Sequence, residues 1–254
     1  MKTKDKRPDP KPRKNPQLWQ SYLWWNELVE MRKRHLLRIS SIEAGKSNLD
    51  AQFERDMIGA LALDAHIESV KKSMINYGQA LGPVWDWVTS IRGLGAGSLA
   101  AQVLAQIDDV AKFDTTSKLW RFAGWAVNDD GQIDRCQRGE KSPYNRKLKS
   151  ICWLVADQFI KQQTPLYVDE YYAEKARQRR LHPEKIKVNG KWKFNDGHLH
   201  HRAMRKVAKL FLRHLWVVWR ESEGLALTQP YVQAVMGHTN IIPPPNWPIE
   251  PSEV

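Results

Sequence analysis

A glycine-rich stretch contains the residues that could most directly bind a ligand. Residues 90–100 read Ser-Ile-Arg-Gly-Leu-Gly-Ala-Gly-Ser-Leu-Ala, with glycine at positions 93, 95 and 97. Because glycine adopts backbone conformations that are closed to other residues, this spacing predicts a tight turn leading into a helix. Such a turn leaves backbone N–H groups unpaired, and they can bind a phosphate. The candidate residues of this turn are Arg92, Gly93, Leu94, Gly95, Ala96, Gly97 and Ser98.

Two interpretations of this turn stay open. The apolar residues on either side of it are typical of a helix-hairpin-helix motif, which holds a nucleic-acid backbone without reading its bases. The alternative is a glycine turn that only joins two packed helices, because three glycines in five residues make a weak motif.

Positively charged side chains that could neutralise phosphates follow the turn. Arg146 and Lys147 begin a predicted helix, where cations oppose the helix dipole and a bound phosphate would relieve the conflict. In the last predicted helix, basic residues including Arg220 keep to a seven-residue rhythm and therefore share one face. A solvated helix face is the ordinary alternative. The basic candidates for phosphate contacts are Arg92, Arg135, Arg138, Lys141, Arg146, Lys147, Arg202, Lys206, Lys209 and Arg213.

Residue types that could bind metals or perform catalysis are better explained structurally. His198, His200 and His201 follow Asp196, but a helical metal site requires ligands four residues apart, so chance histidines at a helix start are the better explanation. The acidic pairs 108–109 and 129–130 could bind Mg²⁺, yet such pairs at helix ends and turns are more often capping residues. We therefore predict no metal, no cofactor and no catalytic residue.

The charge balance favours a polyanionic partner. The 254 residues contain 40 Lys and Arg against 28 Asp and Glu, a formal net charge of +12. Nucleic acid is the first choice and an anionic membrane surface the second. The sequence has neither a membrane-spanning run nor a signal-peptide core, and its two cysteines form no disulfide framework. We expect a cytoplasmic, nucleoid-associated protein.

The periodicity of apolar residues predicts an all-α fold in four parts. Residues 1–14 form a flexible basic arm, and residues 226–254 a proline-rich extended tail. Residues 15–82 form an antiparallel helical hairpin: one helix begins at Pro16 and ends near Ala44, and a second begins after Asn48 and continues to Leu81. The spacing of the second suits a coiled coil. The spare apolar surface of the hairpin indicates a homodimer or a member of a larger nucleoprotein complex, and the alternative is that the hairpin packs on the rest of the molecule.

Residues 83–225 form the predicted helix-hairpin-helix domain. Helices are expected at 84–89, 97–107, between the capping residues 115–117 and Gly124, at 144–163, about 165–180 and 197–222. The last has an apolar stripe at Met204, Val207, Ala208, Phe211, Leu215 and Val218. Residues 125–143 and 182–196 are each predicted to form a loop or a small β-hairpin.

Part of the chain resembles the C-terminal domain of IS110/IS116/IS902-type transposases. The resemblance is carried by the residues from Ser90 to Asp109, by 110–113 and by Leu119 to Trp125. In that family a Pro-Gly-apolar-Gly hairpin leads to a helix that ends in an Ala-Gly pair. The helical hairpin resembles the family's coiled-coil segment. The resemblance covers about residues 16–222 and implies DNA binding.

Three departures from the family argue against its chemistry. Arg92 stands where the family usually has Pro, and the RuvC-like domain with four metal-binding acidic residues has no counterpart. The position of the family's nucleophilic serine falls in Asn-Asp-Asp-Gly at 128–131, and Ser142 lies too far along. We therefore predict a DNA binder that contacts phosphates without sequence preference. The alternatives are a nuclease or recombinase subunit completed by a partner, and an RNA-binding subunit of a larger nucleoprotein complex.

Overall fold

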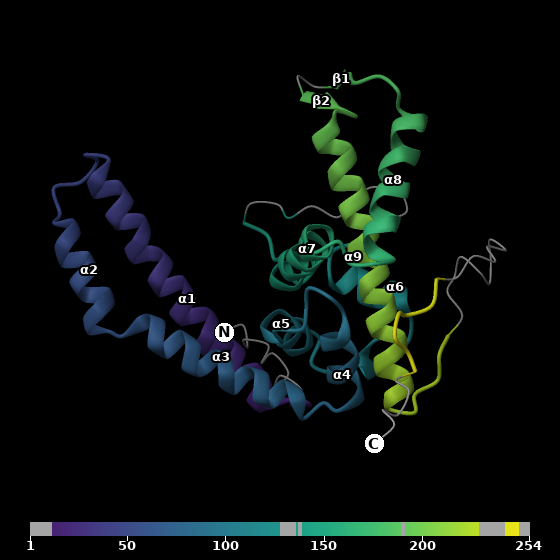
Figure 1. Cartoon of the computed structure of the whole chain (residues 1–254), viewed down its shortest axis with the longest axis horizontal. Helices are drawn as coiled ribbons and strands as arrows, with labels where there is room; N and C mark the ends of the chain where they lie inside the picture. The colour runs from purple at the N-terminus through teal and green to yellow at the C-terminus, as the bar shows by residue number, and fades with distance from the viewer. Residues whose placement is uncertain (1–11, 128–135, 137–138, 189–190, 229–241, 249–254) are drawn as a thin grey trace, which may run out of the picture. The chain divides into compact units, whose positions relative to one another are not determined.

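In the residues that the structure describes, the fold is all-α with a small β-hairpin, as predicted. The computed structural model describes residues 12–127, 136, 139–188, 191–228 and 242–248 (Figure 1). The chain divides into two compact units, residues 1–74 and 75–254. Among the described residues, no helix is both long enough and apolar enough to cross a membrane.

The first unit contains the predicted helical hairpin. Helix α1 (Pro16–Glu43) begins after Asn15 with proline at its first turn, where the missing N–H costs no hydrogen bond. It packs against α2 (Ala51–Ala60). The carboxylate of Glu54, buried on α2, hydrogen-bonds to His35 of α1, which ties the two helices together.

The prediction of one continuous helix from Asn48 to Leu81 is wrong. The helix begins after Asp50, whose side chain accepts a hydrogen bond from the backbone N–H of Gln52. It then ends at Ala60, and α3 (Leu63–Gln79) begins after Ala62. Ala62 has a φ of 45°, so the helical backbone cannot continue through it. Gly59, just before the break, lowers the helix propensity there.

In the second unit, a set of short helices surrounds one long helix. Helices α4 (Pro83–Ser90) and α5 (Ser98–Ile107) flank the glycine turn. They are followed by the short 3-10 helix η1 (Val110–Lys112), α6 (Thr116–Phe122), α7 (Arg146–Lys161) and α8 (Tyr167–Leu181). Helix α9 (Asp196–Ser222) packs against α4, η1, α6, α7 and α8. Figure 1 shows α8 and α9 side by side, with the β-hairpin at one end of the pair.

Aromatic packing on α9 forms the core of this unit. The predicted apolar stripe of the helix is buried throughout. The ring of Phe211 stacks on Trp87 of α4 at 6.4 Å and meets Phe159 of α7 edge-on at 5.6 Å. Because these three large side chains are fully buried, they hold α4, α7 and α9 in fixed positions.

A two-stranded antiparallel hairpin joins α8 to α9. Strands β1 (Ile186–Val188) and β2 (Lys191–Lys193) pair Lys187 with Trp192. This confirms the hairpin alternative for residues 182–196. The sequence between the strands is Asn-Gly, a pair typical of tight hairpin turns. Most of the other predicted hairpin or loop, at 125–143, lies outside the described residues.

Part of the predicted tail packs against the core. Trp87 Nε1 donates a hydrogen bond to the carbonyl oxygen of Pro245 at 2.7 Å, and Asn246 contacts Ser90. The carbonyl oxygen of Ile242 lies 3.0 Å from His214 Nε2 on α9. Residues 242–248 therefore belong to the second unit, whereas 229–241 and 249–254 lie outside the described residues.

The imidazole of His214 predicts a pH dependence of folding. It is fully buried between Tyr167 and Ile242, so its Nε2 donates to the Ile242 carbonyl and its Nδ1 accepts from the Tyr167 hydroxyl at 2.8 Å. Burial lowers the pKa of His214 to about 4 from the ordinary 6.5. The unfolded chain therefore binds this proton more tightly than the folded chain does.

Stability contributed by His214 is present above pH 6.5 and is lost as the pH falls toward 4. Between pH 7 and 5 we expect the free energy of unfolding to decrease by about 2 kcal/mol on this account. His214→Gln keeps a donor and an acceptor but no group that titrates in this range. Urea unfolding at both pH values should show a decrease smaller by about 2 kcal/mol in this variant. Equal decreases would show that His214 is not the titrating group.

Candidate nucleic-acid interface

The glycine turn has the geometry of a tight connection between two helices. Gly93 and Gly97 have φ values of +97° and +74°, which L-residues rarely adopt. A Cβ atom at Gly97 would also lie 3.1 Å from the Trp85 ring. The turn is anchored to the end of α7, because the Thr164 hydroxyl donates to the Arg92 carbonyl oxygen at 2.8 Å.

The turn itself uses several of the N–H groups predicted to face a phosphate. Those of Leu94, Gly97 and Ser98 donate to the carbonyl oxygens of Ile91, Leu94 and Ala96, each at 2.9 Å. The Leu94 side chain is buried in the core. Leu94 and Gly97 are therefore not the free donors that we predicted. Within the described part of the chain, the N–H groups of Gly93, Gly95 and Ala96 have no backbone acceptor.

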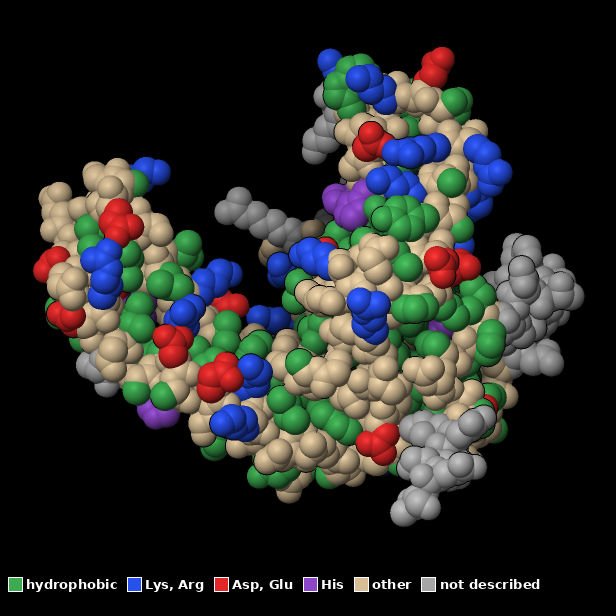
Figure 2. All heavy atoms as spheres, viewed as in Figure 1, with side chains coloured by type: hydrophobic (Ala, Val, Ile, Leu, Met, Phe, Trp, Pro, Cys, Tyr) green, Lys and Arg blue, Asp and Glu red, His purple; other side chains and the backbone are tan. Residues whose placement is uncertain are grey.

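A larger accumulation of charge lies between α8 and α9. These helices, together with Trp120 of α6 and Ile242, enclose a cleft of about 940 Å³, called the α8–α9 cleft below. Its polar lining residues are Glu170, Glu174, Arg177, Gln178, Arg202, Arg205, Lys206, Lys209 and Arg213. Six cations thus face two carboxylates. On the face shown in Figure 2, Lys and Arg outnumber Asp and Glu on the part formed by α8, α9 and the hairpin.

Half of these cations have local partners. Lys206 Nζ lies 2.8 Å from a carboxylate oxygen of Glu170, and Arg177 Nε lies 3.0 Å from Glu174. Arg202 donates to the side-chain oxygen of Gln178. The two glutamates of α8 are therefore already occupied by the paired cations.

The other three cations, Arg205, Lys209 and Arg213, have no carboxylate partner among the described residues. All three are half-buried. Burial lowers the pKa of each side chain. The charge of Arg202 lowers the pKa of Arg205 further, and the charge of Arg205 does the same to Lys209. The Lys209 ammonium lies 4.1 Å from the centre of the Trp120 ring, a cation–π contact that only partly replaces lost water.

The structure brings together four of the predicted site residues: Arg202, Lys206, Lys209 and Arg213 line the α8–α9 cleft. Arg205 and Arg177 also line it, although neither was predicted as a site residue. Arg205 stands three residues after Arg202 and four before Lys209, a spacing that puts it on the same helix face. No sequence signal identified Arg177, because α8 places it there only through tertiary packing.

The remaining basic candidates lie elsewhere. Arg92, Lys141, Arg146 and Lys147 are exposed, and none of them lines the α8–α9 cleft. None of the turn residues 92–98 lines it either. Arg135 and Arg138 lie outside the described residues.

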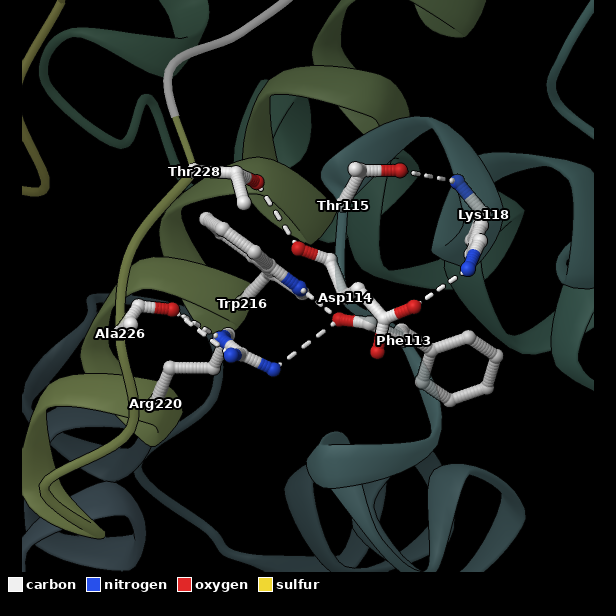
Figure 3. Close-up of polar contacts among 8 residues, drawn as sticks. All are labelled: Phe113, Asp114, Thr115, Lys118, Trp216, Arg220, Ala226 and Thr228. Carbon is white, nitrogen blue, oxygen red and sulfur yellow. Dashed lines mark hydrogen bonds and ion pairs between the residues drawn. The ribbon is translucent and has the colours of Figure 1, made fainter.

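Arg220 does not belong to the phosphate-facing stripe as predicted. Its guanidinium is buried and donates to the carbonyl oxygens of Phe113 at 3.2 Å and Ala226 at 2.7 Å (Figure 3). The Trp216 indole donates to the same Phe113 oxygen at 2.7 Å. Arg220 therefore joins the end of α9 to the segments on either side of it and is unavailable to a ligand.

The histidines near the start of α9 have structural contacts. His198 Nδ1 accepts from the backbone N–H of Phe194 at 2.9 Å, and His200 Nδ1 lies 2.8 Å from the Tyr171 hydroxyl oxygen. In the part of the chain that the structure describes, no three His, Cys, Asp or Glu side chains come together to form a possible metal site.

Comparison with known proteins identifies no relative: no family model, no curated protein and no solved structure matches the chain. The resemblance to the transposase domain stays a prediction.

Proposed function

We propose that the protein binds nucleic acid through its phosphates, and that the α8–α9 cleft is the main contact. The observation that carries this proposal is a group of three half-buried cations that have no carboxylate partner in the part of the chain that the structure describes: Arg205, Lys209 and Arg213. A cation that has lost water and gained no partner is costly, so evolution retains such a group most readily for a ligand of opposite charge.

A phosphate backbone suits this arrangement in chemistry and length. Guanidinium groups bind phosphates through two parallel hydrogen bonds, whereas an ammonium acts as a point charge. From Arg202 to Arg213 the cations extend over about 16 Å of helix axis, because a helix rises 1.5 Å per residue. This length matches several successive phosphates and exceeds the size of a single small anion.

The ligand we propose first is duplex DNA, bound without sequence preference. Contacts to phosphates fix position and carry no sequence information. RNA, or a catalytic partner that acts on the bound nucleic acid, stays an alternative to be separated by experiment.

Binding should be strongly dependent on salt. Fluorescence anisotropy with a labelled 20-base-pair duplex should give an affinity that falls at least about 100-fold between 50 and 300 mM NaCl, because bound cations release counterions from the DNA. Single strands and duplex RNA serve as competitors. Equal affinity at the two salt concentrations would overturn the electrostatic account, and a stronger competition by RNA would redirect the proposal to RNA.

The glycine turn is a second candidate contact, supported by the N–H groups of Gly93, Gly95 and Ala96 that have no backbone acceptor. A Cβ at Gly95 would lie 3.4 Å from the Thr89 carbonyl oxygen, an ordinary contact distance, so valine can be accommodated there and adds bulk next to the N–H groups of Gly95 and Ala96. We expect Gly95→Val to weaken duplex binding by roughly tenfold. Circular dichroism monitors folding, and full binding by a folded variant would exclude the turn as a contact.

A further inference from the structure

The β-hairpin presents a tryptophan to solvent. Trp192 is 52 % exposed, although tryptophan is among the most costly side chains to leave in water. Lys187 stands opposite it in the strand register, and the ammonium groups of Lys185 and Lys187 lie 5.0 and 5.9 Å from the centre of its ring. The exposed indole thus has two ammonium groups over its ring.

The base of the hairpin is fixed to the α8–α9 cleft. The Phe194 ring stacks on His182 at 3.7 Å, and its backbone N–H donates to His198. Arg202, a lining residue of the cleft, lies 5.4 Å from the Phe194 ring centre and 3.0 Å from His182 Nε2. The hairpin that carries Trp192 is therefore held at the Arg202 end of the row of cleft cations. Figure 1 shows the hairpin at the end of the α8–α9 pair where α9 begins.

We propose that Trp192 stacks on an unpaired base of a nucleic acid whose adjoining backbone lies in the α8–α9 cleft. This inference rests on the proposed function and names its preferred ligand: a duplex that continues into a single strand. A base in the middle of a duplex is covered on both faces, so only an unpaired base can accept the indole. The flanking lysines would contact the phosphates on either side of that base.

The surroundings favour a base over an apolar protein surface. Lys185 and Lys187, whose ammonium groups lie over the Trp192 ring, are both exposed. An apolar partner would have to remove water from these ammonium groups without replacing it. A nucleotide instead offers an aromatic base to the indole and phosphates to the ammonium groups.

The test compares a blunt duplex with the same duplex carrying a six-nucleotide single-stranded tail. The tail contains one 2-aminopurine, a base whose fluorescence emission is quenched by stacking. The native chain should bind the tailed duplex about tenfold more tightly, since stacking on an aromatic residue contributes roughly 1–3 kcal/mol per base. Trp192→Leu should abolish both the preference and the additional quenching, without change in affinity for the blunt duplex. Trp192→Phe should restore part of both.

A matched control is Trp24→Leu, which replaces a tryptophan that is 56 % exposed on α1. This variant should retain the preference and the quenching. A Trp192→Leu protein that binds and quenches the tail as the native chain does would overturn the role of Trp192 and leave the cleft proposal intact. Failure of the native chain to bind either duplex would instead overturn the proposed function, and this inference with it.

Discussion

Replacing Arg205, Lys209 and Arg213 together by glutamine should reduce the affinity for duplex DNA by roughly 100-fold at 100 mM salt. These side chains have no carboxylate partner among the described residues, so their removal leaves no buried anion uncompensated. The native cations also repel one another, and the melting temperature of the variant should equal or exceed that of the native chain. Fluorescence anisotropy and thermal unfolding measure the two quantities.

A control of equal charge separates the cleft from net charge. Arg55, Lys71 and Lys161 each form an ion pair outside the α8–α9 cleft, with Glu43, Glu68 and Asp157 respectively. Their combined replacement by glutamine also removes three positive charges. We expect it to weaken DNA binding by less than about threefold, because distant exposed charges are screened by salt. Equal losses in the two triple variants would mean that net charge, and no particular site, determines binding.

Arg220→Met should destabilise the second unit by about 3 kcal/mol, which corresponds to a decrease in melting temperature of roughly 10 °C. The Ala226 carbonyl oxygen would lose both of its guanidinium donors, at 2.7 and 2.9 Å. Phe113 would keep the hydrogen bond from Trp216 (Figure 3). The variant also loses the contact of the guanidinium over the Trp216 ring at 5.2 Å.

The same substitution at Arg213 gives the comparison. Arg213 lies two turns earlier on α9, but it faces the cleft and has no carboxylate partner among the described residues. Arg213→Met should weaken binding and leave the melting temperature nearly unchanged, whereas Arg220→Met should lower the melting temperature. Equal melting temperatures for the two variants would show that the structural role of Arg220 and the binding role of Arg213 are wrongly assigned.

The sequence predicted α9 well because its apolar residues recur with helical spacing over about four turns, from Met204 to Val218. Met204, Val207 and Phe211 are buried as expected. The same periodicity could not distinguish Arg220 from Arg213, since both lie on helical positions that suit a basic stripe. Segments 113–114 and 226–228 pack against the end of α9 and bury Arg220. Arg213 lies outside this contact and stays accessible.

Local sequence was least informative where a single residue interrupts a regular pattern. Residues 53–81 keep an apolar rhythm throughout, so the left-handed backbone at Ala62 has no strong sequence signal. The α8–α9 cleft was only half predicted for a related reason. Its α9 side follows from the spacing of Arg202, Lys206 and Lys209, but its α8 side depends on how two helices pack.

The salt dependence of binding by the Arg205, Lys209 and Arg213 glutamine triple variant shows whether these cations contact phosphates. The slope of log K against log salt counts the phosphates that protein cations neutralise, at about 0.9 per phosphate for duplex DNA. If these three cations contact phosphates, the slope should become shallower by about 3 relative to the native chain. The control triple variant should keep the native slope. An unchanged slope in the cleft variant would contradict the account.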